Sequence, residues 1–140
     1  MAGWRESGWI MGIERRNAPL RGWRILVAED DYFVADELIQ VLERAGAEIV
    51  GPAADLRQAN QIARSGAIDA AILDVNLMGQ LSFPVADTLT EHGVPFMFAT
   101  GYDPAIVPYA YRDVPCFTKP LAAGAIVAAM AAARPLQAAH

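Results

Sequence analysis

Five short apolar runs alternate with helix-forming segments along most of the chain, and this alternation constrains the fold more than any other feature. The apolar runs lie at residues 25–28, 48–50, 70–73, 95–99 and 116–118. The helix-forming segments lie at residues 32–44, 55–64, 84–91, 104–112 and 122–133. Strands that alternate with helices favour one parallel sheet covered on both faces. We therefore predict an α/β domain with a five-stranded parallel sheet.

Capping residues define the first two helices. Asp31 and Asp55 each precede a helical segment, and their carboxylates can accept the orphan N–H groups of the first turn. Apolar residues at helical spacing give the segment 32–44 one face for the core. The residues of this predicted face are Phe33, Val34, Leu38, Val41 and Leu42.

Prolines mark the two weakest points of the pattern. Gly51 and Pro52 are expected to end the second strand, since proline cannot donate a ladder hydrogen bond. Pro104 and Pro108 restrict the segment 104–112, so we expect its helix, the fourth, to be weak or irregular.

Composition narrows the class of protein. The net charge of −5 over 140 residues disfavours binding to nucleic acid or to an anionic membrane. Cys116 is the single cysteine, which excludes an intrachain disulfide and a zinc site built on cysteines. No apolar run has the length of a membrane span, and the first residues lack the features of a signal peptide. We expect a cytoplasmic protein.

The first 22 residues differ from the rest of the chain. They hold Trp4, Trp9 and Ile10 among arginines and glycines, so we place a domain over residues 23–134, with an extension at 1–22 and a tail at 135–140. Three interpretations of the extension stay open. It is a partly disordered tail, it packs on the domain or on a second copy in a homodimer, or it binds another protein, as tryptophan-rich interface segments do.

Charged and hydroxyl side chains follow four of the predicted strands. Glu29 and Asp30 follow the first strand, Asp74 the third, Thr100 the fourth and Lys119 the fifth. In an open parallel sheet, ligands bind beyond the carboxyl ends of the strands. The sequence therefore predicts that these side chains form one site.

Such a site suits phosphoryl chemistry on Asp74. Carboxylates are the ligands that Mg²⁺ prefers, and candidates are Glu29, Asp30, Asp74 and the backbone carbonyl of Asn76. A lysine opposite them would neutralise charge on a phosphoryl group, and the Thr100 hydroxyl could donate to it. Each signal also has a simpler explanation as a helix cap, a strand end or a turn, so the argument rests on their order along the chain.

These segments together resemble the receiver domain of two-component response regulators. The residues that carry the resemblance are 24–31 (RILVAEDD), 72–77 (ILDVNL), 98–101 (FATG) and 118–120 (TKP). The resemblance covers residues 23–133 and implies a flavodoxin-like sheet of strand order 2-1-3-4-5. It also implies phosphorylation of Asp74 by a histidine kinase or a phosphotransfer protein, with Mg²⁺ held by Glu29 and Asp30. A cis peptide bond before Pro120 is a further implication.

The segment 95–103 further resembles the FAT GUY group of single-domain receivers. Within the family Thr100 would be the switch hydroxyl, but Cys116 stands where most receivers have Tyr or Phe. Either Tyr102 or Phe117, the latter after a register slip, could take over the aromatic role.

The predicted function is a stand-alone receiver, not an enzyme, that signals to an unknown downstream protein when phosphorylated. A phosphate sink or a relay with no output partner stays open. The rival from another class is an aspartyl-phosphate phosphohydrolase, which needs a carboxylate where Asn76 stands, two residues after Asp74. A flavin-binding module is a third alternative, without a supporting aromatic or glycine-rich loop.

Overall fold

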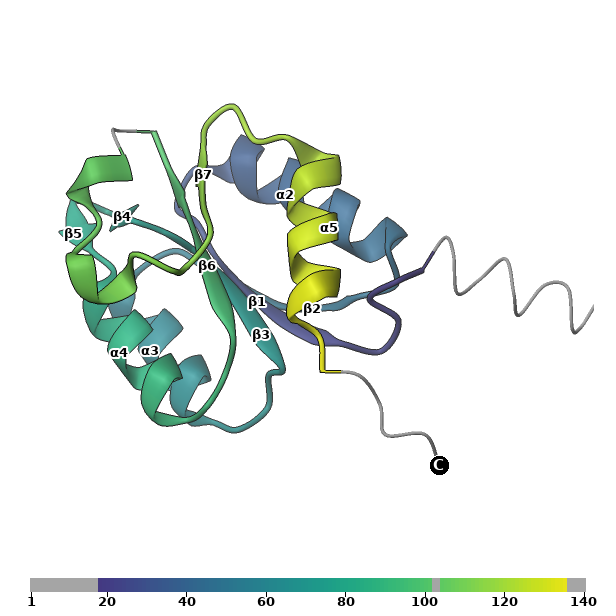
Figure 1. The fold of residues 1–140 in the computed structure, drawn as a ribbon, viewed down its shortest axis with the longest axis horizontal. Coiled ribbons are helices and arrows are strands. Elements are labelled where there is room, and N and C mark those ends of the chain that lie inside the picture. The colour runs from purple at the N-terminus through teal and green to yellow at the C-terminus, as the bar shows by residue number, and fades with distance from the viewer. Residues whose placement is uncertain (1–17, 102–103, 136–140) are drawn as a thin grey trace, which may run out of the picture.

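The computed structural model describes residues 18–101 and 104–135, which form a sheet between two layers of helices (Figure 1). The main sheet contains β1 (Arg24–Ala28), β2 (Glu48–Ala53), β3 (Ala70–Asp74), β6 (Phe96–Thr100) and β7 (Cys116–Thr118). The α-helices are α2 (Tyr32–Arg44), α3 (Leu56–Arg64), α4 (Phe83–Glu91) and α5 (Ala123–Ala133). The two remaining strands, β4 (Asn76–Leu77) and β5 (Gln80–Leu81), pair with each other.

The sheet has the predicted topology. Its strand order is β2-β1-β3-β6-β7, and all four pairings are parallel. This is the order 2-1-3-4-5 when only the strands of the main sheet are counted. The prediction of a five-stranded, flavodoxin-like α/β fold is therefore confirmed.

Two apolar clusters lie on opposite faces of the sheet. One packs α2 and α5 onto it through Leu38, Leu42, Ile126 and Met130. The other packs α3 and α4 onto it and contains the buried Phe98. Because both faces are covered, β1 and β3 are apolar apart from Arg24 at the start of β1 and Asp74 at the end of β3. The polar side chains of these two strands therefore lie at the strand ends.

The second strand is longer than predicted. Gly51 and Pro52 do not end β2, which continues to Ala53. The ladder shifts its register between Leu26 and Ala28, and Gly51 adopts a φ of 114° at this point. A Cβ there would lie 2.9 Å from the carbonyl oxygen of Val27, so the close approach of the two strands requires glycine. The Gly51–Pro52 peptide bond is cis.

The β4–β5 hairpin was not predicted. Met78 and Gly79 form its two-residue turn with φ angles of 52° and 82°. Positive φ at both central residues is what a type I′ hairpin turn requires. Methionine is rare in such a turn, so Gly79 was the one residue that could have indicated the hairpin.

The expected irregularity of the fourth helix is confirmed. Two short 3₁₀ helices, η1 (Pro104–Ile106) and η2 (Tyr109–Tyr111), stand between β6 and β7 in place of a regular helix. Their outer surface carries the exposed side chains of Ile106 and Tyr109.

Packing of the domain extends to residues before Gly22. Leu20 is fully buried in the cluster under α2 and α5, and its N–H donates to the carbonyl of Ala45 at 2.8 Å. Arg134, after α5, donates to the carbonyl of Pro19 and lies over the ring of Trp23. The interpretations given for Trp4, Trp9 and Ile10 lie outside the described residues, as do Tyr102 and all of the tail beyond Pro135.

Within residues 18–101 and 104–135, none of the helices combines the length and the hydropathy that a membrane span needs.

The helix caps predict different costs for two similar truncations. Asp55 is the N-cap of α3 and accepts the N–H of Gln58 at 2.8 Å. Ser82 is the N-cap of α4, but its side chain makes no capping hydrogen bond. The buried Ser82 hydroxyl has no hydrogen-bond partner in the described part of the chain. We expect Asp55→Ala to lower the free energy of unfolding by about 1 kcal/mol. Ser82→Ala should change it little, because no hydrogen bond is lost. Urea unfolding measures both, and an equal loss in the two variants would contradict this assignment.

Candidate functional site

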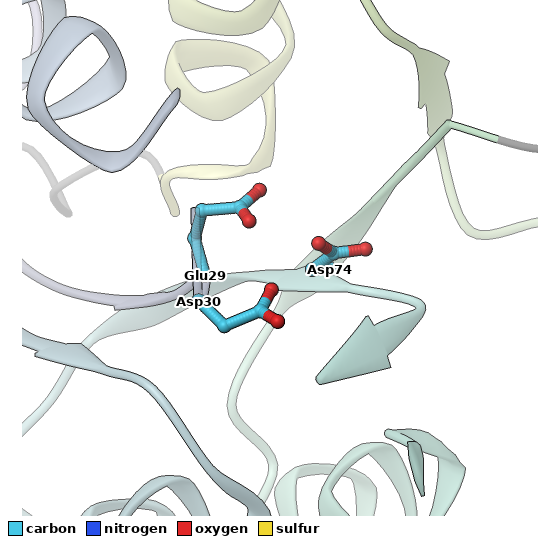
Figure 2. Close-up of side chains that lie close together, drawn as sticks. All are labelled: Glu29, Asp30 and Asp74. Carbon is cyan, nitrogen blue, oxygen red and sulfur yellow. The ribbon is translucent and has the colours of Figure 1, made fainter. Parts of the chain in front are cut away.

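Three carboxylates meet at the carboxyl edge of the sheet. Glu29 and Asp30 directly follow β1, and Asp74 ends the neighbouring strand β3, so parallel pairing brings them together (Figure 2). Each residue offers an oxygen that lies within 4.8 Å of those of the other two. Glu29 and Asp74 are buried, and Asp30 is exposed. The predicted convergence of acidic side chains is thus present in the structure.

Lys119 ties this cluster to a third strand. Its Nζ lies 2.7 Å from Oε1 of Glu29 and 2.8 Å from Oδ2 of Asp74. The backbone positions it, because the N–H of Lys119 donates to the carbonyl of Thr100 at 2.8 Å. The Lys119–Pro120 peptide bond is cis. One ammonium group therefore bridges the ends of β1 and β3 from the end of β7.

Burial and charge oppose each other at Glu29. Burial raises the pKa of Glu29 to about 7, against the lowering effect of the hydrogen bonds from Lys119 and from the N–H of Asp31. The nearby carboxylate of Asp74 raises that pKa further. For Lys119, burial alone would lower the pKa, but the hydrogen bonds to Asp74 and Glu29 outweigh it and raise the pKa. The lysine is therefore charged at neutral pH, while Glu29 is poised to exchange a proton.

The hairpin completes one wall of the site. The N–H of Met78 donates to Oδ2 of Asp30 at 3.1 Å, and the N–H of Asn76 donates to Oδ1 of Asp74 at 3.1 Å. The side chain of Asn76 accepts the N–H of Gly79. An open depression of about 690 Å³ lies at these strand ends and is lined by Glu29, Asp30, Asp31, Asp74, Asn76, Gly79, Gly101 and Lys119. Sequence reasoning missed the contribution of Met78, because its bond to Asp30 spans 48 residues.

The donor set fits a magnesium ion. All three acidic side chains offer hard oxygen atoms, which Mg²⁺ prefers. Three carboxylates and one ammonium group leave two negative charges when all are ionised, and a divalent cation would balance them. Asp30 is exposed and so keeps the cluster accessible from solvent.

The predicted switch residues lie in different places. Thr100 ends β6, fully buried, and the neighbouring Ala99 pairs with Asp74. Cys116 lies beside Phe98 at the start of β7, away from the residues that line the depression. Burial raises the pKa of its thiol, which favours an unreactive cysteine. No register slip occurs, because Thr100 pairs with Thr118, and Phe117 packs on the opposite face of the sheet from Phe98.

One predicted core residue is exposed to solvent. Phe33 is 81% exposed and meets Tyr32, 74% exposed, edge to face with ring centroids 5.7 Å apart. The side chains that α2 buries are Ala35, Leu38 and Leu42, so the assignment of Phe33 to the buried face was wrong. The first turn of α2 instead presents two aromatic rings to solvent, directly after Asp31 in the chain.

Several solved structures share the fold of this chain, and two of them are also at least 35% identical to it in sequence. The structure of SdrG from Sphingomonas melonis Fr1 is 38% identical, covers 79% of this chain and 95% of SdrG, and superposes with a TM-score of 0.71. The BeF3-activated conformation of SdrG from Pseudomonas melonis Fr1 is 35% identical over 78% of this chain and 93% of that one, with a TM-score of 0.59.

A response regulator receiver protein from Sinorhizobium medicae WSM419 shares the fold, with 21% identity over 83% of this chain and 99% of that one and a TM-score of 0.70. No protein-family model matches the chain, and no curated protein matches its sequence. None of these similarities distinguishes groups within a family, so the resemblance to the FAT GUY group stays a prediction.

The raised pKa of Glu29 predicts how stability changes with pH. Because this pKa rises from 4.5 to about 7 on folding, Glu29 contributes stability that is fully present below pH 4.5 and is lost as the pH rises through 7. We compare the free energies of unfolding in the absence of divalent cations. As the pH rises from 5 to 8, wild type should lose on the order of 2 kcal/mol relative to Glu29→Gln. Glu43→Gln, an exposed change on α2, is the control. Parallel pH profiles for wild type and Glu29→Gln would contradict the assignment.

Proposed function

Because the chain belongs to the receiver domains of response regulators, we propose that Asp74 is the residue that accepts the phosphoryl group. The observation that carries this proposal is the single Lys119 ammonium group held between Asp74 and Glu29, with Asp30 beside them. A carboxylate that is buried, held in place and next to a cation is suited to receive and then stabilise a phosphoryl group.

The residues of the chain divide the work of phosphoryl transfer. An oxygen of Asp74 forms the new P–O bond while the P–N bond of a phosphohistidine breaks, and the departing nitrogen takes a proton from solvent. Lys119 already lies 2.8 Å from Oδ2 of Asp74, so its charge stays next to the incoming phosphoryl oxygens. We propose that the Thr100 hydroxyl then donates to one of those oxygens.

Glu29, Asp30, Asp74 and the backbone carbonyl of Asn76 would hold the magnesium ion. When bound, Mg²⁺ neutralises the charge that otherwise makes a carboxylate repel a phosphoryl group. Asp30 is exposed in the described conformation, so the magnesium ion would enter the site at this residue. Glu29 must lose its proton to serve as a ligand, because only the carboxylate form binds a cation well.

The phosphodonor in this proposal is a histidine kinase or a phosphotransfer protein. Tyr32 and Phe33, the two residues that follow Asp31 of the depression, expose their rings to solvent. Exposed aromatic side chains are typical anchors of protein interfaces. A donor whose phosphohistidine reaches Asp74 must cover this edge of the sheet. A cytoplasmic location suits such a partner, and a further protein would read the phosphorylated state.

The rival enzyme gains no support from the site. An aspartyl-phosphate phosphohydrolase needs an acid at position 76, but Asn76 is an amide, and its side chain accepts the N–H of Gly79. A flavin module would need an apolar or aromatic cleft, whereas the depression at the strand ends is lined by four acidic residues, a lysine, an asparagine and two glycines.

Labelling with a small phosphodonor tests the phosphoacceptor directly. With phosphoramidate and Mg²⁺, we expect wild type to gain one phosphoryl group by intact mass spectrometry and Asp74→Asn to gain none. Chelation of the cation should abolish labelling of wild type. Asp55→Asn is the control, because asparagine caps α3 as aspartate does and Asp55 lies outside the depression. Equal labelling of wild type and Asp74→Asn would rule out the proposal.

Beryllofluoride offers a second probe, because it is the activator named for the SdrG relative. We propose that it binds this chain at Asp74 in the presence of Mg²⁺. The same substitution, Asp74→Asn, removes the carboxylate oxygen that beryllofluoride would contact, and should abolish binding.

Magnesium affinity should depend on pH. At pH 6 Glu29, with its pKa of about 7, carries a proton that must leave before a cation binds, whereas at pH 8 it does not. We expect calorimetry to give a dissociation constant about tenfold lower at pH 8 than at pH 6, with proton release at the lower pH. Glu29→Gln should bind more weakly and lose the pH dependence. An affinity for Mg²⁺ that is the same at both pH values would contradict the role given to Glu29.

A further inference from the structure

One face of β6 carries a row of side chains that leads away from the phosphorylation site. Side chains alternate along a strand, so Thr100, Phe98 and Phe96 share one face. Met97 and Ala99 belong to the cluster under α2 and α5, whereas Phe98 and Phe96 belong to the cluster under α3 and α4. The row begins at Thr100, at the same edge of the sheet as Asp74. It continues along the face of β6 that α3 and α4 cover.

Tyr111 of η2 closes this row. Its ring centroid lies 5.8 Å from that of Phe98 and 5.7 Å from that of Phe96, with both pairs edge to face. It also stacks on Phe83, the first residue of α4, at 6.4 Å. The residue beside Phe98 on β7 is the small Cys116. Strand β7 supplies no aromatic side chain on the face that carries Phe98. The aromatic ring that packs there comes from η2 instead.

A hydrogen bond fixes Tyr111 to α4. The Tyr111 hydroxyl donates to Oδ1 of Asp87. Burial and then this bond raise the pKa of Tyr111 to about 12, so the hydroxyl remains a donor at neutral pH. Tyr111 thus fastens η2 to both β6 and α4. The same pair of 3₁₀ helices exposes Ile106 and Tyr109 to solvent, at 42% and 77%.

In the described conformation the Lys119 ammonium group is paired with the Asp74 carboxylate itself, an arrangement that a phosphoryl group on Asp74 would have to displace. Only three residues separate Thr100 from η1, so a shift of the Thr100 end of β6 changes the point from which the η1–η2 segment departs. In a close-packed cluster, such a shift cannot leave the ring on Phe98 undisturbed.

From this geometry we propose that Tyr111 is a positioning residue that couples Asp74 to the η1–η2 segment. Its bond to Asp87 and its packing on Phe98 stabilise the unphosphorylated arrangement, and phosphorylation releases them. The inference rests on the proposed function of Asp74. An interaction that stabilises the unphosphorylated arrangement opposes the shift to the phosphorylated one. It must therefore weaken the binding of a phosphoryl group or its mimic at Asp74.

Beryllofluoride affinity tests this coupling in the full chain. With Mg²⁺ and beryllofluoride followed by amide NMR, Tyr111→Phe should bind about fivefold more tightly than wild type, because the bond to Asp87 no longer has to break. Tyr109→Phe is the matched control, since the same hydroxyl is removed from the same 3₁₀ helix at an exposed ring, and its affinity should equal that of wild type. Asp87→Ala should match Tyr111→Phe, and the double variant should add nothing more.

Each outcome separates the coupling from the proposed function. If Tyr111→Phe melts at a lower temperature but binds beryllofluoride as wild type does, Tyr111 is only structural and the coupling is wrong. Weaker binding by Tyr111→Phe would overturn it as well, because the bond would then belong to the activated arrangement. If wild type binds no beryllofluoride, the proposed function of Asp74 fails and takes the coupling with it.

Discussion

The rest of the site depends on the pairing of Lys119 with two buried carboxylates. Glu29 and Asp74 end neighbouring strands in an apolar sheet, where two unpaired negative charges would cost several kcal/mol. Lys119 lies within 2.8 Å of both and so makes the arrangement stable without a cation. The compensation is incomplete, which is why burial still raises the pKa of Glu29 to about 7. A site that retains excess negative charge is one that a divalent cation can complete.

Much of this arrangement could be predicted because it follows from local patterns. Apolar runs ending in Glu29, Asp74 and Lys119 place charged groups at strand ends, and parallel pairing brings those ends to one edge. The prolines at 104 and 108 correctly indicated a weak helix, now seen as η1 and η2. The strand order came from the resemblance to receivers, since alternation alone does not determine it.

The failures share a physical cause, which is dependence on distant contacts. The Met78–Gly79 turn holds Asp30 through a bond across 48 residues, and β2 continues past Gly51 because that glycine fits against the carbonyl of Val27. Phe33 has helical spacing from Val41 yet is 81% exposed, although Ala35 in the same turn of α2 is buried. Tyr111 was not singled out, because its packing on Phe98 appears only when η2 is placed against β6. Local periodicity carries no information on such contacts.

Strand β6 lies between the charged cluster proposed to receive the phosphoryl group and the aromatic cluster around Tyr111 that is proposed to respond to it. The central claim is that Asp74 alone is the acceptor. Borohydride reduction of the phosphorylated protein converts a phosphoaspartate to homoserine, and peptide mass spectrometry then locates the change. The account predicts homoserine at position 74 and at no other position. Homoserine at position 30 or 31, or at several acidic residues, would contradict it.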